Sequence, residues 1–254
     1  MRLPKTSKLL KLDLEYNMAF HYSPKLVTDG LVLALDASNP KSYPGTGTTW
    51  YDLTPNSLNA TLNSGPVFST DNHGTIIFDG VNDYATIGTS ALTAINVLTF
   101  ELWINRTGIA TTTAPYDRIF QKDGGVSGYP AWGWHINETN PTSISFKSAW
   151  GGSSGQTNNT ISFDSNDTIS LNEWNCLATT INSSLLVSNY FNGSLSSTGT
   201  LGTAPMTTQD VIRIAQGDSR EFQGKISSVK VYNRALTADE VSQNYNALKN
   251  RFGL

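Results

Sequence analysis

The sequence predicts an all-β protein, a two-sheet antiparallel sandwich that ends in one short C-terminal helix. Many short segments alternate apolar and polar residues, as Leu98–Arg106 does, which is typical of strands with one buried face. Turn-forming residues separate these segments, and Asn192-Gly193 stands between two of them as a hairpin turn. After the first thirty residues, the one strong helix signal follows Thr237. Many short strands joined by Gly and Asn turns favour a sandwich.

The C-terminal helix is predicted from its capping residues. Thr237 is a good N-cap, and Glu240 three residues later completes a capping box. Val241, Tyr245 and Leu248 then fall on one helical face, so we expect this helix to lie on a sheet.

The strands are predicted from period-two alternation and from the turn residues that bound them. The expected strands and strand pairs are Leu31–Leu35, Trp50–Leu53 with Asn59–Leu62, Thr75–Ile87 with a turn at Gly80, Leu98–Arg106, Arg118–Lys122, Ala131–Asn137, Ser143–Ser148, Glu173–Ile181, Leu185–Phe191, Val211–Ala215 and Ile226–Val231. No linker-like composition divides residues 26–254, which we interpret as one domain.

Composition excludes several function classes. The 254 residues carry 17 Lys and Arg against 20 Asp and Glu, a net charge of −3, which disfavours nucleic-acid binding. No apolar run reaches the length of a membrane span, and the N-terminus lacks the pattern of a signal peptide. The single cysteine, Cys176, is interpreted as a small buried apolar residue.

Residues 1–25 form a basic, leucine-bearing segment that differs from the rest of the chain. Leu10, Leu12 and Leu14 alternate with polar residues, so an added strand fits this segment better than a helix. One interpretation is a floppy terminus. The other is an assembly arm that docks on a neighbouring subunit, and Met18 offers an alternative start that would make the arm an upstream extension.

Several segments in order resemble the laminin G-like branch of the concanavalin A-like lectin/glucanase superfamily. They are Thr28–Asp36, Ser42–Trp50, Phe78–Tyr84, Phe100–Ile104, Asn172–Trp174, Tyr190–Gly193, and Gly224–Ile226 through Asn233–Leu236. The two ends, Ser23–Gly30 and Arg251–Leu254, resemble versions found in virion proteins of tailed bacteriophages. The resemblance implies a jelly-roll sandwich of two curved sheets with the first and last strands adjacent; it does not by itself give a function.

Catalysis is not expected, although the resemblance brings in glycoside hydrolases. That chemistry ordinarily needs two carboxylates, whereas Glu101 stands alone on its strand and Asp79 and Asp83 lie in a turn. The resemblance also leaves room for a structural calcium, whose oxygen ligands would come from acidic residues. The candidates are Asp36, Asp79, Asp83 and Asp218, and no metal site or other cofactor is assigned from them.

Aromatic and polar residues supply the candidate glycan site. Trp103 shares a strand face with Glu101 and Asn105, the mixture expected of a lectin's concave surface, with half-buried core as the alternative. Tyr129 and Trp150 stand beside Gly-rich loops and are further candidates. By contrast, Trp132, Trp134 and Ile136 share one face of their strand, a pattern more typical of core.

The sequence therefore favours a non-catalytic, lectin-like virion protein of a tailed phage. We expect it at the virion surface, oligomeric, in contact with other virion proteins and with host-surface glycan. The alternative is a capsid decoration or cement subunit that acts only in assembly, and a glycoside hydrolase is the third reading.

Overall fold

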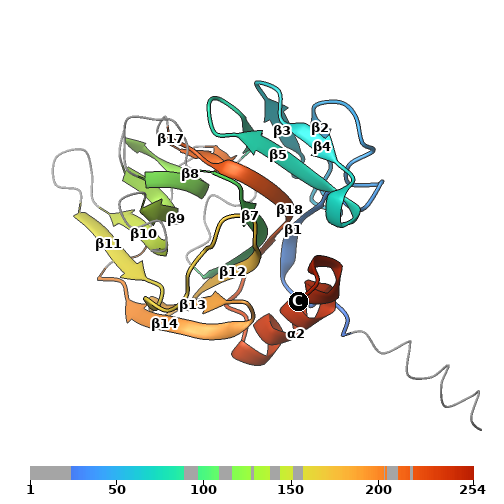
Figure 1. Cartoon of the computed structure of the whole chain (residues 1–254). Coiled ribbons are helices and arrows are strands. Elements are labelled where there is room, and N and C mark those ends of the chain that lie inside the picture. Colours follow the sequence, from blue (N-terminus) through green and yellow to red (C-terminus); the bar gives the residue numbers. More distant parts are fainter. Residues whose placement is uncertain are drawn as a thin grey trace, which may run out of the picture.

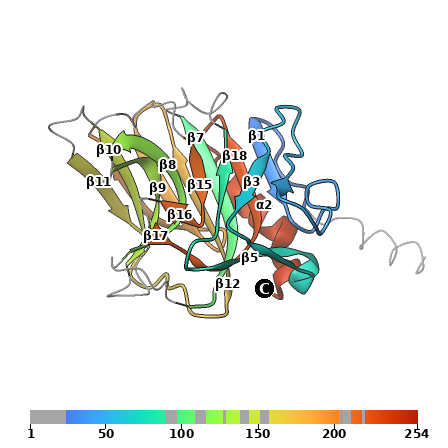
Figure 2. The same cartoon turned by 90° about the horizontal axis from the view of Figure 1, so that it is seen from above.

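The computed structural model describes residues 24–88, 97–108, 116–126, 129–137, 144–150, 157–202, 204, 211–217 and 220–254. Seen from two directions, these residues form two antiparallel sheets packed in layers, with a helix on the outer side of one sheet (Figure 1, Figure 2). The predicted fold class, an antiparallel β sandwich with one short C-terminal helix, is confirmed.

One of the two sheets, which we call sheet A, is built around the last strand of the described chain. Its order is β14-β13-β12-β7-β18-β5-β4, and β1 also pairs with β18. The strands are β1 (Leu31–Asp36), β4 (Val67–Ser69), β5 (Thr75–Asp79), β7 (Leu98–Arg106), β12 (Trp174–Ile181), β13 (Leu186–Phe191), β14 (Ser194–Thr200) and β18 (Gln223–Tyr232). Along one edge β18 pairs with β7, and along the other it pairs first with β5 and then with β1. The first and last strands, β1 and β18, are thus adjacent, as the resemblance implied.

The second sheet, sheet B, has the order β11-β10-β9-β8-β15-β6-β3-β2. Its strands are β2 (Thr49–Trp50), β3 (Ala60–Asn63), β6 (Tyr84–Ile87), β8 (Tyr116–Val126), β9 (Tyr129–Asn137), β10 (Ile144–Trp150), β11 (Thr157–Ser162) and β15 (Ile212–Ile214). A small hairpin of β16 (Gln216–Gly217) and β17 (Arg220–Glu221) forms a separate ladder between β15 and β18. A short 3-10 helix, η1 (Asp71–His73), precedes β5.

Aromatic residues from both sheets fill the core between them. Phe100 of β7 packs against Trp132 and Trp134 of β9, with ring centroids 5.0 and 4.6 Å apart. The indole Nε1 of Trp134 donates a hydrogen bond of 2.8 Å to Thr179 Oγ1 across the sandwich. The prediction that Trp132, Trp134 and Ile136 are core residues is confirmed, since all three are buried.

The helix α2 (Ala238–Leu248) and the following 3-10 turn η2 (Lys249–Phe252) lie on the outer face of sheet A. The predicted capping box is present: Glu240 N donates to Thr237 Oγ1, and Thr237 N donates to the Glu240 carboxylate. Arg234 also binds that carboxylate at 2.6 Å, and its guanidinium lowers the pKa of Glu240 to about 2. The turn η2 ends at Gly253, whose φ of 76° is the left-handed conformation common at helix C-termini.

Two aromatic side chains fix this C-terminal segment to the sheet. Phe252 stacks on Trp103 with the ring centroids 4.2 Å apart, and Tyr245 stacks on the same indole at 5.5 Å. Val241 is buried and Leu248 is half-buried, so the predicted helix face is the one that meets the sheet.

The Asn192-Gly193 turn joins β13 to β14 as predicted. Both residues have positive φ, 49° and 78°, the geometry of a type I′ hairpin. A Cβ at Gly193 would stand 2.7 Å from Tyr245, so the turn also needs a glycine to pass under α2.

Two further sequence predictions concern the single cysteine and membrane-spanning segments. Cys176 is buried and unbridged in the cluster around Trp103, as expected of a small apolar residue. Among the helices in the described part of the chain, none has both the length and the hydrophobicity needed to cross a bilayer.

We predict that docking of the C-terminal segment stabilises the sandwich. Phe252→Ala should lower the free energy of unfolding by about 3–5 kcal/mol, because it removes a buried ring. Thr237→Ala should lower it by about 1 kcal/mol through loss of the cap. Urea denaturation measures both, and Leu254→Ala, at an exposed position, is the matched control with an expected change below about 0.5 kcal/mol. Unchanged midpoints for Phe252→Ala would show that this segment does not contribute to the fold.

Candidate functional site

The three glycan-site candidates on β7 are buried, which corrects the sequence prediction. Trp103 and Glu101 are 0% exposed and Asn105 is 6% exposed. The alternation itself is as predicted, since these residues face away from the core between the sheets. The expectation of an open face was wrong, because α2, η2 and the segment around Val27 cover this side of sheet A.

Glu101 belongs to a buried polar network that attaches α2 and the N-terminal segment to sheet A. Lys230 Nζ donates to Glu101 Oε1 at 2.8 Å, and Asn244 Nδ2 donates to Glu101 Oε2 at 3.1 Å. Asn244 Oδ1 accepts from Val27 N at 2.8 Å, and Tyr232 OH donates to Val27 O at 3.1 Å. Every polar group named here has a partner, so the network is structural.

Two pKa shifts agree with a dry interior at this network. Burial raises the pKa of the Tyr232 hydroxyl, and the nearby Glu101 carboxylate raises it further. Burial likewise raises the pKa of the Cys176 thiol well above its usual range. Both groups are buried in the clusters that α2 and η2 form with sheet A.

For the other predicted site residues the structure describes either the backbone alone or nothing. Tyr129 is the first residue of β9 and Trp150 the last of β10, so both belong to sheet B; their side chains are not described. Leu10, Leu12 and Leu14 of the proposed arm lie outside the described residues, as does Asp218.

The remaining acidic candidates for calcium have other roles. Asp79 Oδ1 accepts from Val81 N at 2.8 Å, and Asp83 Oδ2 accepts from Asp79 N at 3.1 Å, which is the turn-forming role considered from sequence. Asp36 forms an ion pair of 2.8 Å with Arg251. Within the described ranges, no three His, Cys, Asp or Glu side chains gather as metal ligands.

An open polar surface does exist, on the outer face of sheet B. Strands β3, β6 and β15 each alternate buried apolar residues with outward polar ones. The pairing register aligns Thr61, Thr86 and Arg213 in one row across these strands, with Asn63 and Tyr84 in the next row. We call these five residues the polar face. Neighbouring strands are about 4.8 Å apart, so the first row is roughly 10 Å long.

Hydrogen bonds and a ring contact hold the side chains of the polar face in place. Asn63 Nδ2 donates to Thr61 O at 2.8 Å and to Thr86 Oγ1 at 3.2 Å, which leaves the hydroxyl proton of Thr86 available as a donor. The guanidinium of Arg213 lies over the ring of Tyr84, 5.6 Å from its centroid. The polar face therefore presents fixed hydroxyl, amide and guanidinium groups, while Thr61 is exposed and the other four are half-buried.

The β16–β17 hairpin borders the polar face on the side of β8. Gly217 lies so close to Gln121 that an added Cβ would be 2.5 Å from its Oε1. Beyond this border Gln121 and Arg118 of β8 and His135 of β9 are buried. The polar face thus extends over β3, β6 and β15 and ends at the β16–β17 hairpin.

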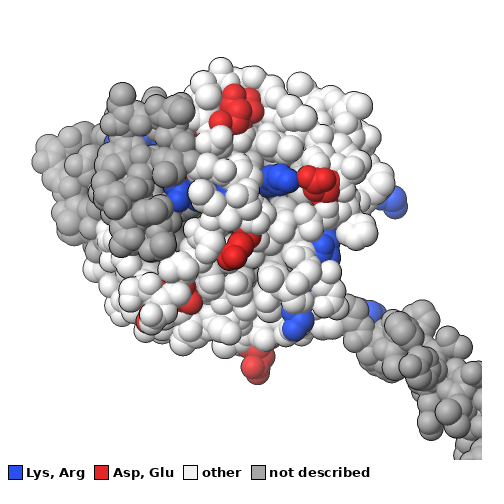
Figure 3. All heavy atoms as spheres, viewed as in Figure 1, with Lys and Arg blue, Asp and Glu red and all other residues white. Residues whose placement is uncertain are grey.

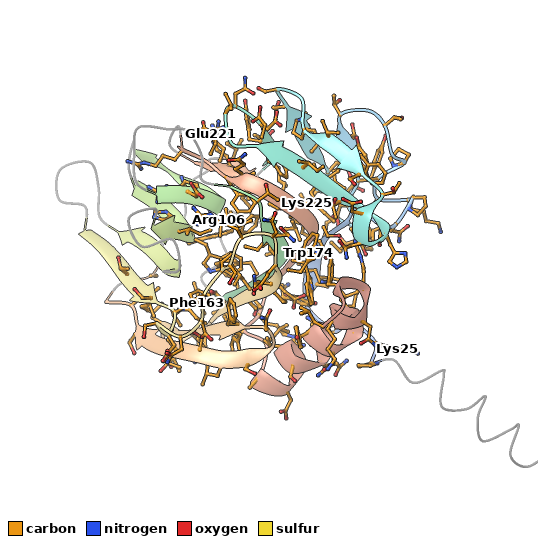
Figure 4. The ribbon with its side chains drawn as sticks, in the orientation of Figure 1. Lys25, Arg106, Phe163, Trp174, Glu221 and Lys225 are labelled. Carbon is orange, nitrogen blue, oxygen red and sulfur yellow. The ribbon has the colours of Figure 1, made fainter. Side chains whose placement is uncertain are left out.

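Charges on the surface are spread widely. On the side of the molecule seen in Figure 3, acidic and basic side chains are scattered and form no single-sign patch. Figure 4 shows Glu221 near β17 and far from Trp174, which lies beside the C-terminal segment. Burial raises the pKa of Glu221, and its Oε1 accepts from Gln216 Nε2 at 3.3 Å.

Sequence reasoning missed the polar face, although a signal was present. The triplet Ile212-Arg213-Ile214 alternates strictly, and so does Tyr84–Ile87, which places Arg213, Tyr84 and Thr86 on outward faces. Alternation of apolar and polar residues shows which side chains point outward from a strand, but it does not show which strands pair with it. The outward residues of the three strands could be joined into rows only once the register of β3, β6 and β15 was known.

Comparison with known proteins supports one family. A model of the concanavalin A-like lectin/glucanases superfamily matches residues 79–242, more than half of the chain. Comparison with curated protein sequences finds no match.

Solved structures with the same fold include toxin binding domains and a sialidase. The binding domain of botulinum neurotoxin serotype D is 14% identical over 85% of this chain, with a TM-score of 0.64. The binding domain of botulinum neurotoxin DC, in complex with SialylT, is 13% identical over 87% of this chain, with a TM-score of 0.64. Our chain spans about half of each, 51% and 52%. The sialidase of Trypanosoma rangeli in complex with sialic acid is 13% identical over 96% of this chain and 38% of its own, with a TM-score of 0.60.

We predict that Glu101 and Lys230 act in stability. Lys230→Met should cost about 3–5 kcal/mol, because it leaves the Glu101 carboxylate buried without its cation. The double variant Lys230→Met/Glu101→Leu should recover part of this loss, since it removes both charges together. Thermal or urea unfolding checks both. Lys225→Gln, which breaks the exposed pair with Asp71, is the control and should leave the unfolding midpoint nearly unchanged. Equal stability of wild type and Lys230→Met would contradict the structural role.

Proposed function

Because the chain belongs to the concanavalin A-like lectin/glucanases superfamily, we propose that it is a non-catalytic protein that binds carbohydrate on the polar face of sheet B. One observation carries the proposal: β7 and β12 at the centre of sheet A are buried along their whole length, whereas β3, β6 and β15 present a row of outward polar side chains that are exposed or half-buried. Hydroxyl, amide and guanidinium groups are the ones that sugar hydroxyls pair with.

Two neighbours in fold favour a glycan ligand. One is a toxin binding domain in complex with SialylT and another is a sialidase in complex with sialic acid. Both are 13% identical to this chain, so the choice of a glycan ligand depends mainly on the polar face itself.

The absence of catalysis is also part of the proposal. Glycoside hydrolysis ordinarily uses two carboxylates on either side of the scissile bond. Among the described residues of the polar face and its bordering hairpin, the carboxylate present is Glu221, which is buried. The arrangement favours binding over bond cleavage.

We further propose that the protein stands on the virion of a tailed bacteriophage, where it is oligomeric and contacts other virion proteins. The resemblance of Ser23–Gly30 and Arg251–Leu254 to such proteins motivates this setting. Gln243 Nε2 donates to Lys25 O at 2.6 Å, so the described chain begins beside α2 (Figure 4). Sheet A separates this side from the polar face, which suits attachment at one side and ligand at the other. A cement subunit without glycan binding is the alternative that the same geometry permits.

The polar face can be tested by a glycan array followed by titration calorimetry. Thr61→Ala/Thr86→Ala should weaken binding about tenfold or more, because each lost hydrogen bond is worth about 1 kcal/mol. Thr198→Ala, an exposed threonine on β14, is the matched control and should bind like the wild type. Binding that is insensitive to the double variant would move the site elsewhere, and no binding to any glycan would favour the cement alternative. Release of reducing sugar from a bound glycan would overturn the non-catalytic assignment.

Assembly can be tested by removing residues 1–23. Since β1 and β18 pair without these residues, the melting temperature should stay nearly unchanged, while incorporation into the particle or oligomer should be lost. Differential scanning calorimetry and sedimentation give the two readouts. A truncated protein that unfolds would assign residues 1–23 to the core, and one that assembles normally would make them a dispensable terminus.

A further inference from the structure

The buried network on the outer face of sheet A brings an amine, a carboxamide and a carboxylate together. Lys230 of β18, Glu101 of β7 and Asn244 of α2 are 3%, 0% and 0% exposed. Lys230 Nζ donates to Glu101 Oε1 at 2.8 Å, and Asn244 Nδ2 donates to Glu101 Oε2 at 3.1 Å. One carboxylate therefore contacts the amine through one of its oxygens and the amide nitrogen through the other.

These three groups are the ones that amide exchange between two side chains requires. A lysine amine can replace the nitrogen of an asparagine carboxamide, but the amine must first lose a proton and the departing nitrogen must gain one. A carboxylate in contact with both nitrogens can carry out both transfers, first as a general base and then as a general acid. Because the fold holds the two partners beside the same group, the entropy cost of bringing them together is already met.

The carboxamide of Asn244 is held in a way that favours attack at its carbonyl carbon. Val27 N donates to Asn244 Oδ1 at 2.8 Å, where it can stabilise the negative charge that this oxygen gains when a nucleophile adds to Cγ. Asn244 Nδ2 also donates to Tyr232 OH at 2.9 Å, which fixes the plane of the amide. Lys230 Nζ donates to Ser228 Oγ at 3.2 Å, so the amine has a second contact that holds it in place.

The dry surroundings favour the uncharged forms that react. Moving one proton from the Lys230 ammonium to the Glu101 carboxylate converts two buried charges into two neutral groups, and this lowers the cost of keeping them out of water. The neighbouring Tyr232 hydroxyl reports the same environment, since burial raises its pKa.

We propose that Lys230 and Asn244 form an intramolecular isopeptide bond, with Glu101 as the catalytic residue. Glu101 takes one proton from Lys230 Nζ, the amine adds to Cγ of Asn244, and the Val27 N–H stabilises the oxygen. Glu101 then gives that proton to Nδ2 and takes a second one from Nζ. The Cγ–Nδ2 bond breaks, the Nζ–Cγ amide remains, ammonia leaves, and Glu101 ends protonated and uncharged. The ion pair described above is the arrangement before this bond forms.

The isopeptide bond joins the central strand of sheet A covalently to the helix that covers it. Since β18 supplies the lysine and α2 supplies the asparagine, the covering layer stays attached to the sheet even when its hydrogen bonds open. The bond lies in sheet A and is independent of the carbohydrate site proposed on sheet B.

Mass spectrometry of the folded, full-length chain tests the proposal. The intact mass should be lower than the mass calculated from the sequence by one ammonia. Trypsin should not cleave after Lys230, whose amine is acylated, and should release a branched peptide in which Ile226–Arg234 is joined to Ala235–Lys249. Glu101→Gln and Lys230→Met should each have the full mass of their sequence. Circular dichroism reports whether these variants fold, and the wild-type mass decides the question where they do not.

The matched controls change the same residue types on the same elements. Lys225→Gln on β18 and Asn246→Ala on α2 should both keep the loss of ammonia. A wild-type chain that retains its full mass after prolonged incubation in the folded state would overturn the inference, and so would a folded Glu101→Gln variant that still loses ammonia. An Asn-Gly pair can also release ammonia by ring closure, so a loss that maps to Asn192 in place of the branched peptide would overturn it as well.

Discussion

Strands β7 and β18 lie side by side at the centre of sheet A and are covered on both faces, so each of their side chains needs a partner inside the protein. On the inner face the aromatic residues of sheet B supply those contacts. On the outer face, Trp103 lies under Phe252 and Tyr245, and Glu101 meets Lys230 and Asn244. The C-terminal segment is therefore an integral layer of the sandwich, not an appendage.

The buried pair of Glu101 and Lys230 defines how this layer is seated. Moving two charges out of water costs several kcal/mol per ion, which their mutual attraction repays only with good geometry and further hydrogen bonds. Here Asn244 and Ser228 supply those bonds. Removing one partner would leave the other charge buried and unpaired, so the pair disfavours any docking of α2 that separates the two charges.

Local signals in the sequence predicted those parts of the fold that depend on neighbouring residues. The capping box at Thr237, the Asn192-Gly193 hairpin and the alternation along β7 all depend on contacts within a few residues. Strand β11 was not predicted, because its asparagines have low strand propensity. The role of Trp103 was mistaken since alternation cannot tell which segment, more than a hundred residues away, covers a face. Arg213 was passed over for the same reason, because its row exists only through the register of three separate strands.

The position of β18 has a consequence for synthesis of the chain. This strand is the last in sequence, yet it pairs with β7, β5 and β1, which are made far earlier. Until residue 232 has left the ribosome, three strands of sheet A keep unpaired backbone edges, and exposed edges are templates for association with other chains. Contacts of such long sequence separation also slow folding. The sandwich thus closes only after residue 232 has been translated, and the nascent chain is vulnerable to aggregation until then.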